Sequence, residues 1–145
     1  MRRTKLEKGI LFLCEDAGLS LMAESIAKHM KPPKTRIFSA VLRPGKIPPE
    51  VRQVLQEIGV ELSGETVKSV DQVAANDFDL VVSFGDAAEQ CSSLPKKTRV
   101  EKWSIANPMR LAGENSGVLS AYRHDRDEID KRVAALFLDH WRHAS

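Results

Sequence analysis

Cys14 is the residue of this chain whose neighbours best prepare it for chemistry. It follows an apolar run, residues 10–13, and a short loop separates it from an amphipathic segment, residues 21–30. The unpaired backbone N–H groups and partial positive charge at a helix start lower the pKa of a nearby thiol and bind oxyanions. The order of strand, cysteine, loop and helix therefore predicts an oxyanion site with a thiolate nucleophile.

The side chains of that loop predict the opposite. The candidate binding loop consists of Glu15, Asp16, Ala17, Gly18, Leu19 and Ser20. It contains two carboxylates and no arginine. Carboxylates within ~4–6 Å of a bound dianion repel it and raise the pKa of a neighbouring thiol. We therefore expect the loop to exclude anions, although the elements around it have the arrangement of an anion site.

The composition is typical of a soluble globular protein. With 145 residues, 42% of them apolar, the chain is predicted to form one domain over residues 1–145, of which 1–8 are flexible. A net charge of +2 does not predict nucleic-acid binding, and no apolar run approaches the ~20 residues of a membrane span. Because no secretory signal is recognisable, we expect a cytoplasmic protein with reduced thiols and no membrane partner.

Alternating strands and helices define the predicted fold. Apolar and β-branched runs predict strands at 10–13, 36–41, 79–84 and 99–105. Helical spacing of apolar residues predicts helices at 21–30, 48–58, 69–75 and 120–140. This alternation predicts an α/β domain with a four-stranded, mostly parallel sheet flanked by helices, in which ligands bind beyond the carboxyl ends of the strands. Cys14 and Gly85 both lie at such ends.

Taken together, these segments resemble the low-molecular-weight protein tyrosine phosphatases and the related thioredoxin-coupled arsenate reductases. The resemblance covers nearly the whole chain. Besides the strand that ends at Cys14, it is carried by Met22-Ala23-Glu24, Phe38-Ser39-Ala40, Ile58-Gly59-Val60, Ser63-Gly64, Lys68-Ser69-Val70, Asp77-Phe78-Asp79-Leu80-Val81-Val82 and Asn107-Pro108. The resemblance implies a low-molecular-weight phosphatase-like fold and chemistry at the Cys14 loop.

The phosphatases of this family carry a cysteine, five further residues, an arginine and a serine. The residue six positions after Cys14 is Ser20; alignment on Met22 instead leaves the loop one residue short and puts Leu19 in the place of the arginine. Both alignments stay open, and the guanidinium is missing in each. Because arginine stabilises the charge that builds up in the transition state, and loss of a single donor typically costs ~10²–10³ in rate, activity should fall severely.

The family's other functional residues are also altered. Asn107 stands where the phosphatases have the aspartate that acts as general acid, and an amide cannot donate that proton. Arsenate reductases need two more cysteines after the third strand, where this chain has Gly85 and, further on, Cys91. Cys91 is the candidate redox partner of Cys14 through thiol–disulfide exchange. The histidines have no ligand spacing, so neither a metal nor a cofactor is expected.

Two functions follow from these observations. The leading hypothesis is a binding or regulatory domain with a degenerate oxyanion loop and without efficient phosphatase activity. The alternative is an active thiol enzyme, a phosphotyrosine or phosphate-monoester phosphatase or an arsenate reductase, that uses Cys14 as nucleophile. The resemblance implies a small oxyanion or a phosphoprotein as partner, and a thioredoxin-type partner if the redox hypothesis holds.

Overall fold

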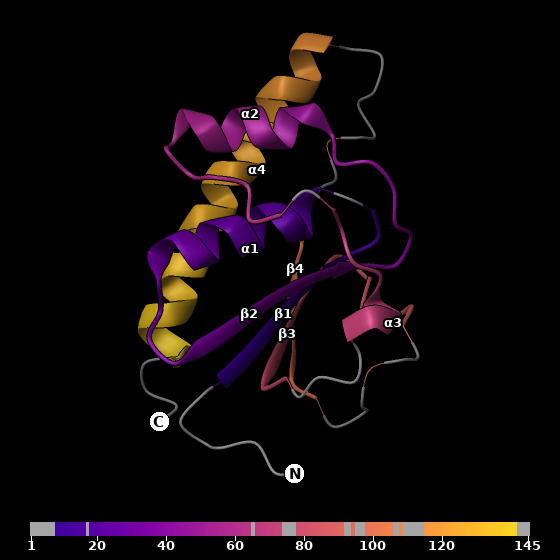
Figure 1. Cartoon of the computed structure of the whole chain (residues 1–145), viewed down its shortest axis with the longest axis vertical. Helices are drawn as coiled ribbons and strands as arrows, with labels where there is room; N and C mark the ends of the chain where they lie inside the picture. The colour runs from indigo at the N-terminus through magenta and orange to yellow at the C-terminus, as the bar shows by residue number, and fades with distance from the viewer. Residues whose placement is uncertain are drawn as a thin grey trace.

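A four-stranded sheet forms the centre of the molecule (Figure 1). The computed structural model describes residues 8–16, 18–64, 66–73, 78–91, 94, 98–105, 108 and 115–141, without the side chains of 115, 116 and 139–141. The strands are β1 (Lys8–Cys14), β2 (Thr35–Val41), β3 (Leu80–Phe84) and β4 (Val100–Trp103). Their order is β2-β1-β3-β4, and every neighbouring pair is parallel. The predicted α/β fold is therefore confirmed.

Helices cover both faces of this sheet. They are α1 (Leu19–Met30), α2 (Pro49–Glu57), the short α3 (Val70–Val73) and α4 (Asn115–Ala135), which continues as a π-helical turn (Leu136–Trp141). One apolar cluster joins α1, α2 and α4 to one face of the sheet, and a second joins α3 and the segment after β3 to the other face. In Figure 1, α3 accordingly lies apart from the three longer helices. Among the described helices, none is long and apolar enough to span a membrane.

The central strand explains the apolar run before Cys14. Along β1, Ile10 and Phe12 belong to the first cluster, whereas Leu11 and Leu13 belong to the second. All four side chains are fully buried, because a parallel strand between two neighbours has helices or loops on both faces. Cys14 continues the alternation and enters the first cluster, on the side of α1 and α4.

Most predicted boundaries differ from the observed ones by one or two residues, and three differences have a clear cause or size. The first helix begins at Leu19 instead of residue 21, because the carbonyl of Gly18 already accepts the N–H of Met22 at 2.9 Å. The last helix begins at Asn115 instead of about residue 120, since residues 115–117 are polar or glycine, whereas its π-helical continuation to Trp141 ends close to the predicted residue 140. The fourth strand, Val100–Trp103, is shorter than predicted. Residues 1–7 of the predicted flexible start lie outside the described part, whereas Lys8 begins β1.

A polar network fixes the chain that crosses α1 after α2. Glu24 Oε1 accepts hydrogen bonds from Ser39 Oγ at 2.8 Å and from Ser63 Oγ at 2.9 Å. The backbone N–H of Ser63 donates to Ser25 Oγ at 3.0 Å, and Lys28 Nζ lies 3.2 Å from Glu24 Oε2. A single carboxylate on α1 thus holds β2 and the crossing segment together. Glu24, Ser39 and Ser63 are among the residues that carried the family resemblance.

Candidate functional site

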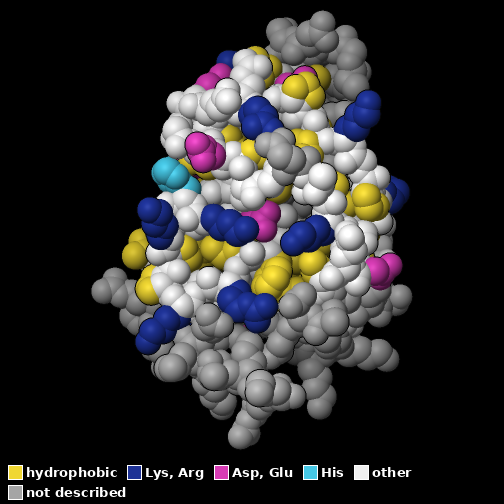
Figure 2. Space-filling view, viewed as in Figure 1, with side chains coloured by type: hydrophobic (Ala, Val, Ile, Leu, Met, Phe, Trp, Pro, Cys, Tyr) yellow, Lys and Arg dark blue, Asp and Glu magenta, His cyan; other side chains and the backbone are white. Residues whose placement is uncertain are grey.

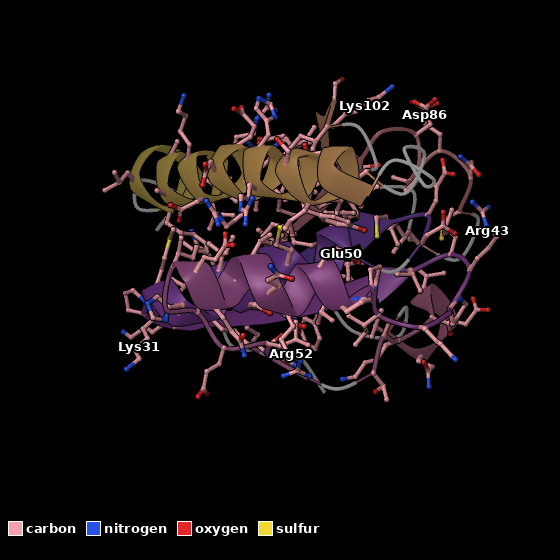
Figure 3. The ribbon with its side chains drawn as sticks, turned by 90° about the horizontal axis from the view of Figure 1, so that it is seen from above. Lys31, Arg43, Glu50, Arg52, Asp86 and Lys102 are labelled. Carbon is pink, nitrogen blue, oxygen red and sulfur yellow. The ribbon has the colours of Figure 1, made fainter. Side chains whose placement is uncertain are left out.

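The Cys14 loop lies at the carboxyl end of the central strand. The N–H of Leu42, just after β2, donates to the carbonyl of Cys14 at 3.1 Å, so the ends of β1 and β2 are joined. Gly85 follows β3, which pairs with β1 on its other side. Figure 3 shows Arg43 and Asp86, which follow β2 and β3, at this same end of the molecule. The loop therefore lies at the carboxyl edge of the parallel sheet, between the ends of β2 and β3.

The thiol of Cys14 is buried and hydrogen-bonded. Its side chain is 5% exposed, and the sulfur lies 2.5 Å from the carbonyl oxygen of Asp16 and 3.0 Å from Ser20 Oγ. Burial raises the pKa of Cys14 from 9.0 to about 11, although hydrogen bonds from the side chain and backbone of Ser20 act in the opposite direction. The thiol is therefore protonated at neutral pH, despite its place before a helix start.

The acidic residues of the loop, Glu15 and Asp16, bind Arg43, which the sequence did not predict to be part of the site. Arg43 Nη2 lies 3.0 Å from Glu15 Oε1, and Arg43 Nε lies 3.4 Å from Asp16 Oδ1. The hydrogen bond to Glu15 is the main reason that the pKa of Arg43 is raised. Gln90 Nε2 donates to the other oxygen of Glu15 at 2.9 Å. Arg43 thus supplies one positive charge against the two carboxylates of the loop, and Gln90 adds a neutral hydrogen-bond donor.

The parallel register of β1 and β2 explains why Arg43 lies beside the loop. Cys14 pairs with Val41, so the next two residues of each strand run side by side: Glu15 beside Leu42 and Asp16 beside Arg43. The N–H of Arg43 donates to the carbonyl of Glu15 at 2.9 Å, which continues this pairing beyond the strands. Glu15 and Arg43 are 28 positions apart in the sequence, so local spacing does not predict this pair.

Leu19 and Ser20, the two candidates for the arginine position, are both buried. Leu19 is 4% exposed and belongs to the first apolar cluster, and Ser20 is 1% exposed. The N-cap of α1 is Gly18, with φ of 133° and no side-chain hydrogen bond to the helix start. A Cβ atom at Gly18 would lie 3.6 Å from Tyr122 Oη. An aliphatic side chain and a phenol therefore occupy the surroundings of the helix start.

Tyr122 and Asp125, one turn apart on α4, are buried polar residues behind the loop. Tyr122 is fully buried and Asp125 is 7% exposed. Tyr122 Oη and Asp125 Oδ2 have no hydrogen-bond partner among the described residues. Burial raises the pKa of both groups, that of Asp125 to about 6. The pKa of Tyr122 is raised further by the charges of Glu50, Asp125 and Cys14. Its phenol is therefore protonated at neutral pH.

The remaining predicted site residues are distributed as follows. Cys91 is half-buried and packs against the second apolar cluster, on the opposite face of the sheet from Cys14. Both cysteines are free thiols. Ala17 of the loop and Asn107, at the general-acid position, lie outside the described residues. Within the described part of the chain, no three metal-ligating side chains gather into a group.

Comparison with known proteins agrees with this fold. The family described as low molecular weight phosphotyrosine protein phosphatase matches residues 9–143. An arsenate reductase from Bacillus subtilis strain 168 is 31% identical over 128 residues, which cover 87% of this chain and 92% of that protein. The crystal structure of an arsenate reductase from Archaeoglobus fulgidus superposes with a TM-score of 0.72 at 31% sequence identity. The match covers 90% of this chain and 99% of that one.

A third relative is a thioredoxin-dependent arsenate reductase from Corynebacterium glutamicum. It is 25% identical, with a TM-score of 0.69, and the match covers 94% of this chain and 63% of that one. Residues 9–143, which the family model matches, include β1 from its second residue, the Cys14 loop and all the helices described above. On this evidence the chain belongs to the low molecular weight phosphotyrosine protein phosphatase family.

Proposed function

We propose that this member of the family is a binding or regulatory domain that does not catalyse efficient phosphate transfer. The observation that carries the proposal is the state of Cys14, a buried thiol bonded to Asp16 and Ser20 with its pKa raised to about 11. At pH 7, well below that pKa, the thiol is protonated, and the thiolate that must attack phosphorus is a minor species.

The charges around the loop support the same proposal. An incoming dianion would meet Glu15 and Asp16 at the loop, and Arg43 is already paired with both of them. Leu19 brings apolar surface instead of a guanidinium to the start of α1. A site that stabilises a phosphoryl transition state needs cationic donors aimed at the reacting group, and in this loop the cation is aimed at carboxylates.

The alternative proposal is a thiol enzyme, and a specific observation favours it as well. Cys14 keeps its place between β1 and α1, with a serine hydroxyl 3.0 Å from the sulfur, and the relatives above are named arsenate reductases. In that case the partner would be an oxyanion such as arsenate or a phosphoprotein, and a thioredoxin-type protein would reduce the enzyme. Cys91 would have to approach Cys14 from the other face of the sheet.

Hydrolysis of p-nitrophenyl phosphate by the wild type and by Cys14→Ser tests the proposal. We expect no difference between the two proteins above the buffer rate at pH 5 to 8, and no heat of phosphate binding in calorimetry at pH 7. Phosphate binding, together with turnover that the Cys14→Ser substitution abolishes, would return the chain to the working phosphatases.

Arsenate reduction needs a separate assay. Wild type and Cys91→Ser are incubated with arsenate, thioredoxin, thioredoxin reductase and NADPH, and NADPH oxidation is followed. We expect the background rate in both. Arsenate-dependent oxidation that disappears in Cys91→Ser would establish the redox alternative and a thioredoxin-type partner.

A further inference from the structure

The outer side of β2 carries backbone groups that no described strand pairs. β2 is an edge strand of the sheet, and β1 is its neighbour on the inner side. The carbonyl of Lys34 accepts the N–H of Lys8, the first residue of β1, at 2.9 Å, so the even-numbered residues of this segment face β1. Because backbone groups alternate in direction along a strand, those of Ile37 and Ser39 face outward. Among the described residues, no backbone group bonds to them.

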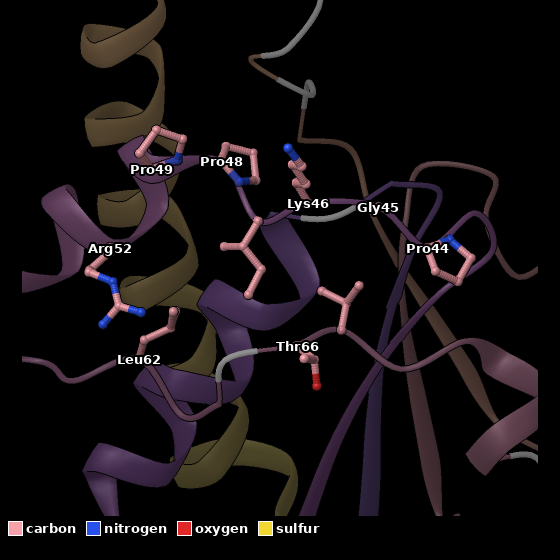
Figure 4. A pocket seen from close by; sticks show the side chains of 10 residues that line it. Pro44, Gly45, Lys46, Pro48, Pro49, Arg52, Leu62 and Thr66 are labelled. Carbon is pink, nitrogen blue, oxygen red and sulfur yellow. The ribbon is translucent and has the colours of Figure 1, made fainter.

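The crossing segment after α2 limits this edge at its carboxyl end. The N–H of Val41, which also faces outward, donates to the carbonyl of Lys68 at 2.9 Å, and Val41 and Ser69 form a parallel bridge. Figure 4 shows the segment that carries Thr66 crossing the strands before it reaches α3. At a rise of ~3.3 Å per residue, the edge between Lys34 and Val41 is about 23 Å long. An extended peptide of about seven residues has this length.

Apolar side chains flank the edge on both faces of the sheet. Ile37 and Met30 are partly buried and pack against the first apolar cluster, whereas Phe38 packs against the second. The ring of Phe38 forms a T-shaped contact with Phe78, with the ring centroids 5.3 Å apart. Because the side chains of a strand alternate between the two faces, a peptide paired with β2 would cover both apolar surfaces.

The charge at both ends of the edge is positive. Lys31 and Lys34 are exposed just before β2, and Lys68 is exposed at the other end. Within the described part of the chain, none of these three lysines forms an ion pair. Over α1 and β2, Figure 2 shows Lys and Arg side chains around hydrophobic ones, with few acidic side chains between them. The edge therefore offers apolar surface and unpaired backbone groups between two positive ends.

We propose that the outer edge of β2 binds an extended acidic peptide segment of a partner protein, which adds a fifth strand to the sheet. Carboxylates at the two ends of the segment would lie near Lys34 and Lys68, and its backbone would bond to Ile37 and Ser39. A second copy of this chain is disfavoured, because antiparallel pairing of two such edges would bring the lysines at their ends together. The proposal goes beyond the function proposed above and does not depend on it, since no residue of the Cys14 loop belongs to this edge.

Amide exchange followed by nuclear magnetic resonance, with the synthetic peptide acetyl-DEVTITED-amide as probe, tests the proposal. At a peptide concentration ten times its Kd, exchange of the Ile37 and Ser39 amides with deuterated water should slow about tenfold. The amide of Phe38 already faces β1 and should gain less protection. The peptide DEVPPTED has the same charge but lacks two adjacent backbone donors, and KKVTITKK reverses the charge, so we expect neither to protect these amides. Equal protection by DEVPPTED would overturn the proposal.

Charge variants locate the acidic ends of the bound peptide. We expect the double substitution Lys34→Gln and Lys68→Gln to weaken binding of DEVTITED about tenfold. The matched control combines Lys102→Gln and Lys131→Gln, which remove the same charge from exposed positions on β4 and α4, and it should bind like wild type. Unchanged affinity in the first double variant, or an equal loss in the control, would exclude the proposed charge recognition at the β2 edge.

A backbone variant tests strand pairing itself. Ile37→Pro removes an outward-facing N–H and leaves the bonds to β1 in place, and proline is tolerated at such edge positions. We expect this variant to lose the peptide-dependent protection of Ser39, while unchanged amide signals in β1 and β3 verify its fold. Protection of Ile37 and Ser39 in wild type that rises with protein concentration, without peptide, would show self-pairing of the edge and would overturn the choice of an acidic partner.

Discussion

At Cys14, burial decides the protonation state. A helix start and the hydroxyl of Ser20 favour the thiolate, but desolvation opposes it and has the larger effect on the pKa. A working phosphatase loop would offset that desolvation with a nearby cation. Here Arg43 is bound to Glu15 and Asp16 instead, so the balance remains on the side of the neutral thiol.

Alkylation kinetics measure this balance directly. In a Cys91→Ser background, we expect iodoacetamide to modify Cys14 at pH 7.5 at least about tenfold more slowly than a free cysteine, whose pKa is about 8.5. The rate should rise with pH up to about pH 11. The control is Cys14→Ser, in which the half-buried Cys91 alone reacts. A Cys14 rate that levels off below pH 8.5 would contradict the buried, protonated state.

Asp125 gives the second prediction at this scale. Burial raises its pKa in the folded state from 3.8 to about 6, so the folded protein binds more protons than the unfolded chain between about pH 4 and pH 6. The free energy of unfolding contributed by this group therefore falls as pH rises through that window. We expect Asp125→Asn to be more stable than wild type at pH 7 to 8, by at most about 3 kcal/mol, and equally stable near pH 3.

Urea denaturation of both proteins across pH 3 to 8 is the measurement. Asp130→Asn is the matched control, since its side chain is exposed on the same helix. A stability difference between Asp125→Asn and wild type that does not change with pH would rule out titration of Asp125 as its cause.

At the scale of elements, an arginine pair on α4 holds α2. Arg126 donates to the carbonyl of Val54 at 3.0 Å and to Glu57 Oε1 at 2.7 Å, and its side chain is 10% exposed. Arg123 binds the same carboxylate at 2.7 Å, but its side chain is 44% exposed. The arginines keep the pKa of Glu57 below its usual value.

The two arginines provide a matched comparison. We expect Arg126→Met to lower the free energy of unfolding by about 1–3 kcal/mol, because the buried carbonyl of Val54 loses its charged donor. Arg123→Met should cost less than about 1 kcal/mol, because solvent screens an exposed ion pair. Chemical denaturation of both variants is the measurement. Equal losses would show that burial of Arg126 adds nothing to its ion pair.

Elements and their order were predictable because hydrophobic periodicity is local. Residues 10–13 are apolar because β1 is covered on both faces, and the resulting fold agrees with the structure. The start of α4 was missed because its first turn has no apolar stripe. The pairing of Arg43 with Glu15 and the unpartnered hydroxyl of Tyr122 depend on register and packing between distant segments. The sequence thus predicts where the loop lies, but not the partners of its side chains.

At the scale of the whole molecule, β1 has parallel neighbours on both sides, as β3 does, and its residues 10–13 are fully buried. Its backbone amides can reach deuterated water only when the entire domain opens. Their exchange rates should therefore report the same free energy as urea denaturation. Amides of the edge strand β4, where Val100 is 48% exposed, should exchange through smaller local openings and far sooner. A ligand that stabilises the fold would be visible first as slower deuteration at the centre of the sheet.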